Sequence, residues 1–133
     1  MSVDRLSSEA VKKVSGPAWE PLRESFFDVS RTLLKVNSET LAVLTTIYVK
    51  YQTTSASSSD VYAVVWLRNS KQIVVGLSLP ESVESGLLGP APKGMSYRGI
   101  TKYLTIKQGD IIPQELALWA EAAYQSAATK SEV

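Results

Sequence analysis

The stretch VYAVVWLRNSKQIVVGLSL, residues 61–79, decides the fold of this chain. Its opening run, 61–67, is apolar throughout, which is typical of a central strand covered on both faces or of a strand whose second face binds a ligand. Polar residues 68–71 follow, and Asn69 tolerates the left-handed backbone conformation that tight hairpin turns require. Residues 72–79 then alternate in character, which predicts a second strand. The sequence therefore predicts two neighbouring antiparallel strands.

Upstream of this hairpin the spacing of apolar residues changes. After Pro17 they recur every three or four residues, the spacing that lines one face of a helix. These residues are Trp19, Leu22, Phe26, Val29, Leu33 and Val36. The polar pair at 37–38 can end this helix, and we expect a short second helix over 39–44. Over 45–52 the period becomes two, which predicts a strand with one solvent-exposed face.

Downstream of the hairpin, residues 80–99 are rich in glycine and proline and predict a long loop, either a binding flap or a partly disordered segment. Alternating residues after Ile100 predict another strand, and Pro113 can open a final helix. We predict the α+β class, in which helices pack on one face of an antiparallel sheet of about four strands. The predicted order is α-α-β-β-β-loop-β-α.

The composition, 44% hydrophobic and 20% charged, lies in the globular range. We expect a single α+β domain over residues 16–127, a flexible N-terminal segment over 1–15 and a frayed C-terminus over 128–133. No signal peptide and no apolar run of membrane-spanning length is evident. The sequence therefore predicts a cytoplasmic protein with no membrane partner.

Histidine and cysteine are both absent from the chain. Histidine is the side chain that ordinarily titrates near neutral pH, so a general base would have to be a carboxylate, lysine or tyrosine with a shifted pKa. Transition-metal sites use imidazole or sulfur ligands, and the thioethers of Met1 and Met95 are the only sulfur donors. We therefore predict no catalytic residue, no metal site, no disulfide and no cofactor.

A group of short stretches carries a further pattern. They are TIYVKY at 46–51, VYAVV at 61–65, IVVGLSL at 73–79, YRGI at 97–100, IPQEL at 112–116 and AY at 123–124. Together they resemble an uncharacterised bacterial domain family labelled "predicted transport protein", which occurs alone or appended to restriction-type nucleases. The resemblance covers roughly residues 19–127, and it implies an α+β fold and a bacterial, cytosolic setting.

A more distant resemblance is to the bacterial frataxin-like domains of unknown function, whose chains end in a comparable basic strand and helix. That family implies iron delivery from an acidic ridge. Here Glu81, Glu84 and Asp110 are the only acidic residues between 61 and 114, so the ridge is missing.

Aromatic and basic residues recur together in the predicted strands. Because the net charge is only +1, any attraction for an anion must come from such a local patch. Aromatic rings offer stacking area, and Lys or Arg offers charge for a phosphate, carboxylate or nucleobase. We therefore predict a non-enzymatic module that binds a small ligand or nucleic acid, with the long loop as a flap. The candidate residues are Tyr48, Lys50, Tyr62, Trp66, Tyr97, Arg98, Lys102 and Tyr103.

The same residues have a purely structural interpretation. Tyrosine and tryptophan fit a pleated, half-buried sheet surface, and lysine on an edge strand prevents strand pairing between molecules. An enzyme is a further alternative, in which Lys50 or Lys102 would be desolvated beside Tyr51 or Tyr103 so that the lysine pKa falls. The spacing of residues does not favour this alternative.

A protein-interaction or oligomerisation domain is the other alternative. It would use the apolar strand 61–67 or the Leu87–Leu88 tip of the long loop, and it makes a homo-oligomer possible. Exposure of Tyr62, Val64 and Trp66 in a monomer would favour ligand binding. Their burial in a dimer would favour oligomerisation.

Overall fold

The computed structural model describes residues 8–37, 40–45, 47–52, 61–69, 71–97 and 99–131. In chain order its elements are α1 (Ser8–Val14), the 3-10 turn η2 (Pro17–Trp19), α2 (Glu20–Leu34), β1 (Leu41–Thr45), β2 (Tyr48–Gln52), β3 (Val61–Asn69), β4 (Gln72–Leu77), β5 (Lys102–Lys107) and α3 (Leu116–Ser131). The strands form one antiparallel sheet in the order β1-β2-β3-β4-β5. The α+β class predicted from the sequence is confirmed.

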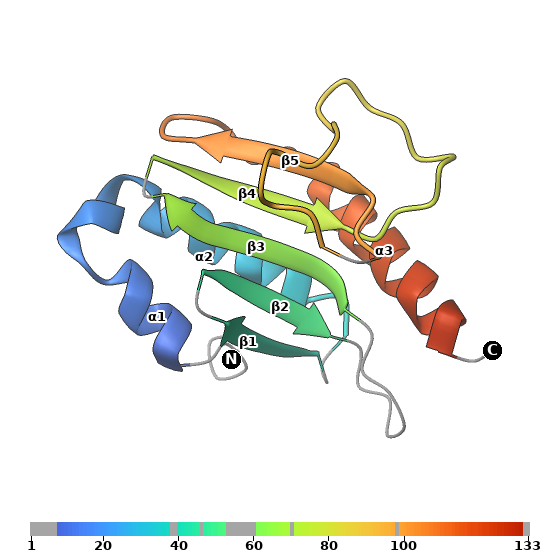
Figure 1. Ribbon diagram of the computed structural model, residues 1–133, viewed down its shortest axis with the longest axis horizontal. Coiled ribbons are helices and arrows are strands. Elements are labelled where there is room, and N and C mark those ends of the chain that lie inside the picture. Colours follow the sequence, from blue (N-terminus) through green and yellow to red (C-terminus); the bar gives the residue numbers. More distant parts are fainter. Residues whose placement is uncertain are drawn as a thin grey trace.

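The helices α2 and α3 cover one face of this sheet (Figure 1). The apolar residues of α2 that recur every three or four positions are buried against the strands, as their spacing predicts. Arg23 ties α2 to the end of α1, because its guanidinium donates hydrogen bonds to the carbonyl oxygens of Val14 and Gly16 at 2.7 and 3.0 Å. Val14 is the last residue of α1, so its bond to Arg23 supplies a partner at the helix end, while the Gly16 carbonyl also accepts from the Trp19 amide at 3.0 Å.

Both ends of the chain contain more helix than the sequence predicts. Ser8–Val14 form α1, although we expected a flexible segment up to residue 15, and Ala10 and Val14 are fully buried. Burial of these apolar side chains against the core stabilises a helix that is too short to persist alone. At the other end α3 continues to Ser131, past the expected frayed start at 128.

The short helix predicted over 39–44 is wrong. Leu41–Thr45 instead form β1, which pairs with β2 from Leu41 opposite Gln52 to Thr45 opposite Tyr48. Ala42 is buried toward the helices while the neighbouring Val43 is 41% exposed, the alternation expected of a strand. The sheet consequently has five strands among the described residues, where the sequence predicts about four.

The hairpin predicted at 61–79 is confirmed. β3 and β4 are neighbours, and Asn69 pairs with Gln72 across the turn. β3 also contains a β-bulge, because Tyr51 of β2 faces Ala63 whereas the next residue, Gln52, faces Val61. The extra residue in β3 is Tyr62, which a bulge turns to the same side as Ala63.

Two buried tyrosines therefore lie beneath α2. Tyr51 donates its phenol hydrogen to Ser30 Oγ at 2.8 Å, and Tyr62 donates to the Leu33 carbonyl oxygen at 2.8 Å. The Tyr62 ring also meets the Tyr124 ring of α3 edge-on, at 5.2 Å between centroids. These contacts join the sheet to both helices and satisfy polar groups that burial would otherwise penalise.

We predict a specific alkaline instability from Tyr51. Burial raises the pKa of Tyr51 above its ordinary value near 10, so the folded state keeps a proton that the unfolded chain loses as pH rises. Stability from this group is complete below about pH 10 and falls above it, by up to about 1.4 kcal/mol per pH unit. Urea unfolding at several pH values should show a shallower alkaline fall in Tyr51→Phe than in the wild type. At pH 7 the variant should lose about 1 kcal/mol, because the bond to Ser30 is gone. Parallel pH profiles would contradict this account.

Candidate functional site

The face of the sheet turned away from α2 and α3, here called the outer face, has its own apolar cluster. Five residues of this outer cluster are buried: Val64, Trp66, Val74, Ile100 and Tyr103. Six more pack against it half-buried: Ile47, Tyr48, Val61, Ala91, Met95 and Tyr97. The cluster draws on β2 to β5 and on the segment between β4 and β5.

Four aromatic rings form the centre of the outer cluster. Tyr48 lies 5.8 Å from Trp66 and 5.6 Å from Tyr97, measured between ring centroids, and Trp66 lies 5.8 Å from Tyr103. Tyr48 and Tyr97 meet edge-on with their planes inclined by 78°. Trp66 and Tyr103 are only 3% and 5% exposed, whereas Tyr48 and Tyr97 are half-buried. Tyr48 and Tyr97 are therefore the two rings of this group that remain partly accessible to solvent.

The long loop, residues 80–99, wraps around the free edge of β5. Its first part packs Val83 and Leu88 against the core beneath the helices. Gly89 of the loop forms a β-bridge with Tyr103 of β5. The Tyr103 amide donates to the Gly89 carbonyl oxygen at 2.9 Å, and the Gly89 amide donates to the Tyr103 carbonyl oxygen at 2.8 Å. Its second part places Met95 on the outer cluster. The loop thus closes the β5 edge and covers the adjacent part of the outer face.

Hydrogen bonds hold the base of the long loop. Thr101 Oγ1 donates to the Leu79 carbonyl oxygen at 2.7 Å and accepts from the Leu79 amide at 3.0 Å. The Tyr97 amide donates to the Tyr103 hydroxyl oxygen at 3.1 Å. Burial raises the pKa of both Tyr97 and Tyr103, so both phenols are neutral at physiological pH and add no negative charge to the outer face.

Gly76 lies where several side chains of the outer cluster pack against β4. A Cβ atom at this position would lie 2.6 Å from Ile100 Cγ2, 3.0 Å from Tyr103 Cε2 and 3.1 Å from Trp66 Cζ3. Contacts this short require the neighbours to move. The missing side chain of Gly76 therefore allows Ile100, Tyr103 and Trp66 to pack close to the backbone of β4.

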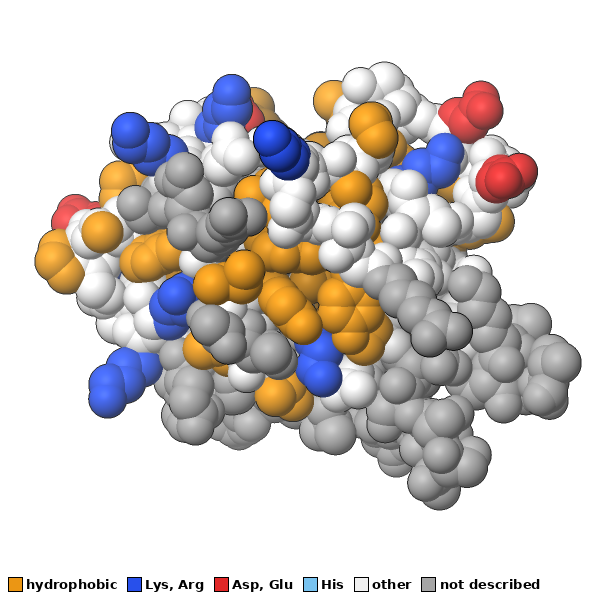
Figure 2. Space-filling view, viewed as in Figure 1, with side chains coloured by type: hydrophobic (Ala, Val, Ile, Leu, Met, Phe, Trp, Pro, Cys, Tyr) orange, Lys and Arg blue, Asp and Glu red, His pale blue; other side chains and the backbone are white. Residues whose placement is uncertain are grey.

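Charge is segregated between the strands and the rest of the fold. The five strands contain no Asp or Glu, and their basic residues are Lys50, Arg68, Lys102 and Lys107. Figure 2 shows the outer face, on which Lys and Arg side chains surround an apolar centre while acidic side chains lie at the margins. An anion that binds over the strands would meet basic side chains and no carboxylate from the strands themselves.

The structure brings most of the predicted site residues together. Tyr48, Lys50, Trp66, Tyr97 and Tyr103 all belong to the outer face or to the loop that covers it. Arg98 lies outside the described residues.

Two predicted members are on the helix side, which corrects the sequence prediction. Tyr62 is fully buried beneath α2 because the bulge reverses its direction. Lys102 pairs with Leu77 and by alternation shares the direction of Leu104, on the helix side, while the adjacent Tyr103 takes the outer side. From the sequence we expected Tyr62, Val64 and Trp66 to be either exposed in a monomer or buried in a dimer. The structure shows neither case, since all three residues are buried within a single chain.

Sequence reasoning missed Lys107 and Gly76. Lys107 is exposed and lies two pleats along β5 from Tyr103, hence on the outer side. The period-two pattern from Tyr103 could have identified Lys107. Nothing in the sequence indicates the role of Gly76, because that role depends on which aromatic rings pack against it in the folded sheet.

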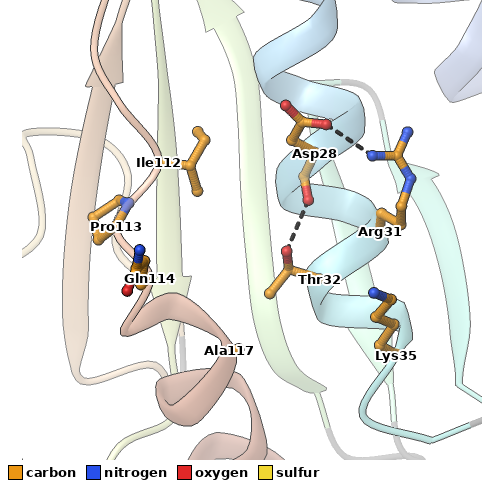
Figure 3. Close-up of a pocket in the computed structure, with 8 residues that line it drawn as sticks. All are labelled: Asp28, Arg31, Thr32, Lys35, Ile112, Pro113, Gln114 and Ala117. Atoms are coloured by element: carbon orange, nitrogen blue, oxygen red, sulfur yellow. Dashed lines mark hydrogen bonds and ion pairs between the residues drawn. The ribbon is translucent and has the colours of Figure 1, made fainter.

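A hollow lies away from the outer face, between α2 and the segment that leads into α3 (Figure 3). It has a volume of about 340 Å³ and is lined by Asp28, Arg31, Thr32, Lys35, Ile112, Pro113, Gln114 and Ala117. Arg31 is already paired with Asp28 at 2.8 Å, and both side chains are about half exposed. A hydrated and internally paired arginine attracts an anion only weakly. We therefore rank this groove below the outer face.

The described residues contain no group of three or more Asp, Glu, His or Cys side chains that could share a metal ion. In the same part of the chain, no helix has the length and apolar character needed to cross a membrane. The enzyme alternative loses two of its pairings, because Lys50 and Tyr51 point to opposite sides of the sheet, and so do Lys102 and Tyr103.

We predict that Gly76→Ala destabilises the protein by about 1–3 kcal/mol, because the new methyl group must displace packed side chains. Gly86→Ala is the matched control, since nothing lies within 4 Å of a Cβ there, and it should change stability by less than about 0.5 kcal/mol. Urea unfolding of the three proteins measures both values. Equal stability of the two variants would show that the outer cluster is loosely packed.

Comparison with known proteins returns no match. No protein-family model, no curated protein and no solved structure matches this chain. The resemblance to the bacterial family labelled "predicted transport protein" therefore stays a prediction made from the residues alone, and any function must be inferred from the site itself.

Proposed function

We propose that this protein is a non-enzymatic module that binds an anionic ligand containing a planar ring, on the outer face beside the long loop. The observation that carries the proposal is the meeting of Tyr48 and Tyr97 next to Lys50, on a sheet whose strands contain no carboxylate. The two tyrosines offer ring surface, and the lysine offers charge.

The spacing of these groups suits such a ligand. Lys50 follows Tyr48 by two residues on the same side of β2, which places their Cα atoms roughly 7 Å apart. A planar group stacked on Tyr48 would hold an attached phosphate or carboxylate within reach of Lys50. Lys50 also lies between Val43 and Val64 in the register, so its charge has no acidic neighbour across the strands.

The ring contacts also support binding in preference to catalysis. The Tyr97 and Tyr103 phenols keep their protons, because burial raises the pKa of each. A neutral phenol donates and accepts hydrogen bonds but is a poor base at neutral pH. These groups fit the recognition of a ligand better than proton abstraction from one.

We predict that Lys50→Gln weakens binding of an anionic ligand about fivefold, the value of roughly 1 kcal/mol for a partly exposed charge contact. Lys35→Gln is the matched control, because it removes an exposed lysine at the C-terminal cap of α2, on the opposite side of the sheet. The measurement is an amide NMR titration with AMP, TMP and pyrophosphate, in which residues 48–50 and 95–97 should shift. A loss of affinity in Lys35→Gln alone would place the site in the groove between α2 and α3.

Self-association through β1 is a second candidate, favoured by one observation. β1 is an end strand with the sequence LAVLT, which contains no charge, and Val43 is 41% exposed on its outer side. An exposed apolar side chain on an uncharged strand is a candidate for contact with a second copy of the chain.

This second candidate predicts that the wild type forms a concentration-dependent dimer and that Val43→Lys is monomeric. Leu118→Lys is the matched control, because Leu118 is an equally apolar residue that is 69% exposed on α3. Size-exclusion chromatography with light scattering gives the three masses. A monomeric wild type at high concentration would remove the candidate.

A further inference from the structure

The proposed function leaves the kind of anionic ligand open, and the shape of the outer face narrows it. We propose that the ligand is a single-stranded nucleic acid, whose bases stack on Tyr48 and Tyr97 and whose phosphates pass Lys50. This inference rests on the proposed function and specifies its ligand class.

The accessible part of the outer face is an open strip. One register row runs across the sheet through Val43, Lys50, Val64, Gly76 and Tyr103. Along this row Val43 is 41% exposed and Lys50 is half-buried, whereas Val64 and Tyr103 are only 0% and 5% exposed. As far as the described residues go, a ligand can therefore lie across β1 and β2 and end against the rings.

An open strip suits a polymer better than a small molecule. Small ligands are usually held in concave pockets that bury most of their surface. Single-stranded nucleic acids instead bind along exposed basic surfaces, where aromatic side chains stack with successive bases. A mononucleotide on this strip would gain one stacking contact and one charge contact, whereas a strand repeats both.

The relative orientation of the rings favours a single strand over a duplex. The planes of Tyr48 and Tyr97 are inclined by 78°, so two bases stacked on them cannot remain stacked on each other. Bases in a single strand can splay apart in this way, whereas duplex bases are held in parallel stacks. Duplex DNA or RNA should therefore bind only through its phosphates.

Basic residues lie on the same side of the molecule as the rings. Lys50 and Lys107 lie on the outer side of β2 and β5, and the exposed Lys93 lies on the long loop. The strands contain no carboxylate, and among the described residues the acids of the loops next to β4 and β5 are Glu81, Glu84 and Asp110, the last of which accepts a hydrogen bond from the Lys107 amide at 2.8 Å. Lys50 and Lys93 therefore carry most of the attraction for a phosphate chain. The basic rim around the apolar centre is visible in Figure 2.

The test is fluorescence anisotropy with fluorescein-labelled dT12 and U12, with the matching 12-base-pair duplex, TMP and a poly-glutamate peptide as competitors. Both single strands should bind at least about tenfold more tightly than the duplex or TMP. Raising the salt from 50 to 200 mM should weaken binding about tenfold, as expected when two or three phosphates are contacted.

Variants connect this binding to the outer face. Tyr48→Leu should weaken dT12 binding about tenfold or more, because stacking on one base is lost, while Tyr48→Phe should retain it. Lys50→Gln leaves the ring cluster intact and should weaken binding about fivefold even if Tyr48→Leu does not fold. Lys35→Gln should bind as the wild type does.

The outcomes separate this inference from the proposed function. If TMP or pyrophosphate shifts residues 48–50 but dT12 binds no more tightly, the nucleic-acid inference is overturned and the proposed function stands. Equal losses in Tyr48→Phe and Tyr48→Leu, or displacement of dT12 by poly-glutamate at equal concentration, would also overturn the inference. If no nucleotide, anion or oligonucleotide perturbs the outer face, both proposals fall.

Discussion

The β-bulge at Tyr62 determines which aromatic side chains of β3 face the helices and which face the outer side of the sheet. Without the extra residue, Tyr62 would point with Val64 and Trp66 to the outer face. With it, the Tyr62 hydroxyl reaches the Leu33 carbonyl at the end of α2, and its ring reaches Tyr124 of α3. One irregularity in β3 thus anchors both helices and leaves the outer face to a separate set of rings.

The two faces of the sheet are covered in physically different ways. On the inner face, α2 and α3 bury a continuous apolar core, and the buried tyrosine hydroxyls all have partners. On the outer face the cover is a loop with small or half-buried contacts such as Ala91 and Met95, fixed chiefly at Gly89 and Thr101. Segments with few buried apolar contacts open at lower free-energy cost than core elements. A ligand that needs Trp66 or Tyr103 would have to displace the loop, and not the helices.

Most of the fold follows from local sequence patterns, and the errors have identifiable causes. The α2 periodicity and the hairpin of β3 and β4 each repeat over enough residues to be unambiguous. The prediction for residues 41–45 was wrong because four consecutive apolar residues fit a short helix or a strand equally well, and only pairing with β2 decides between them. Tyr62 was placed on the wrong side because the bulge in β3 reverses its direction. Lys102 was placed on the wrong side because it is adjacent to Tyr103 in β5, and neighbours in a regular strand point to opposite faces. Tyr48, Lys50, Trp66 and Tyr103 lie on the outer face, as strict alternation within their strands requires.

The position of Lys50 helps to distinguish a binding surface from ordinary sheet packing. A lysine that only protects a sheet from pairing is expected on an end strand, where backbone groups are unpaired. Here the end strand β1 has no charged residue, and the lysine is one strand further in, where both neighbours already satisfy the backbone of β2. Edge protection therefore does not explain Lys50. Its place beside the two accessible tyrosines, on strands without carboxylates, is explained if an anion binds there.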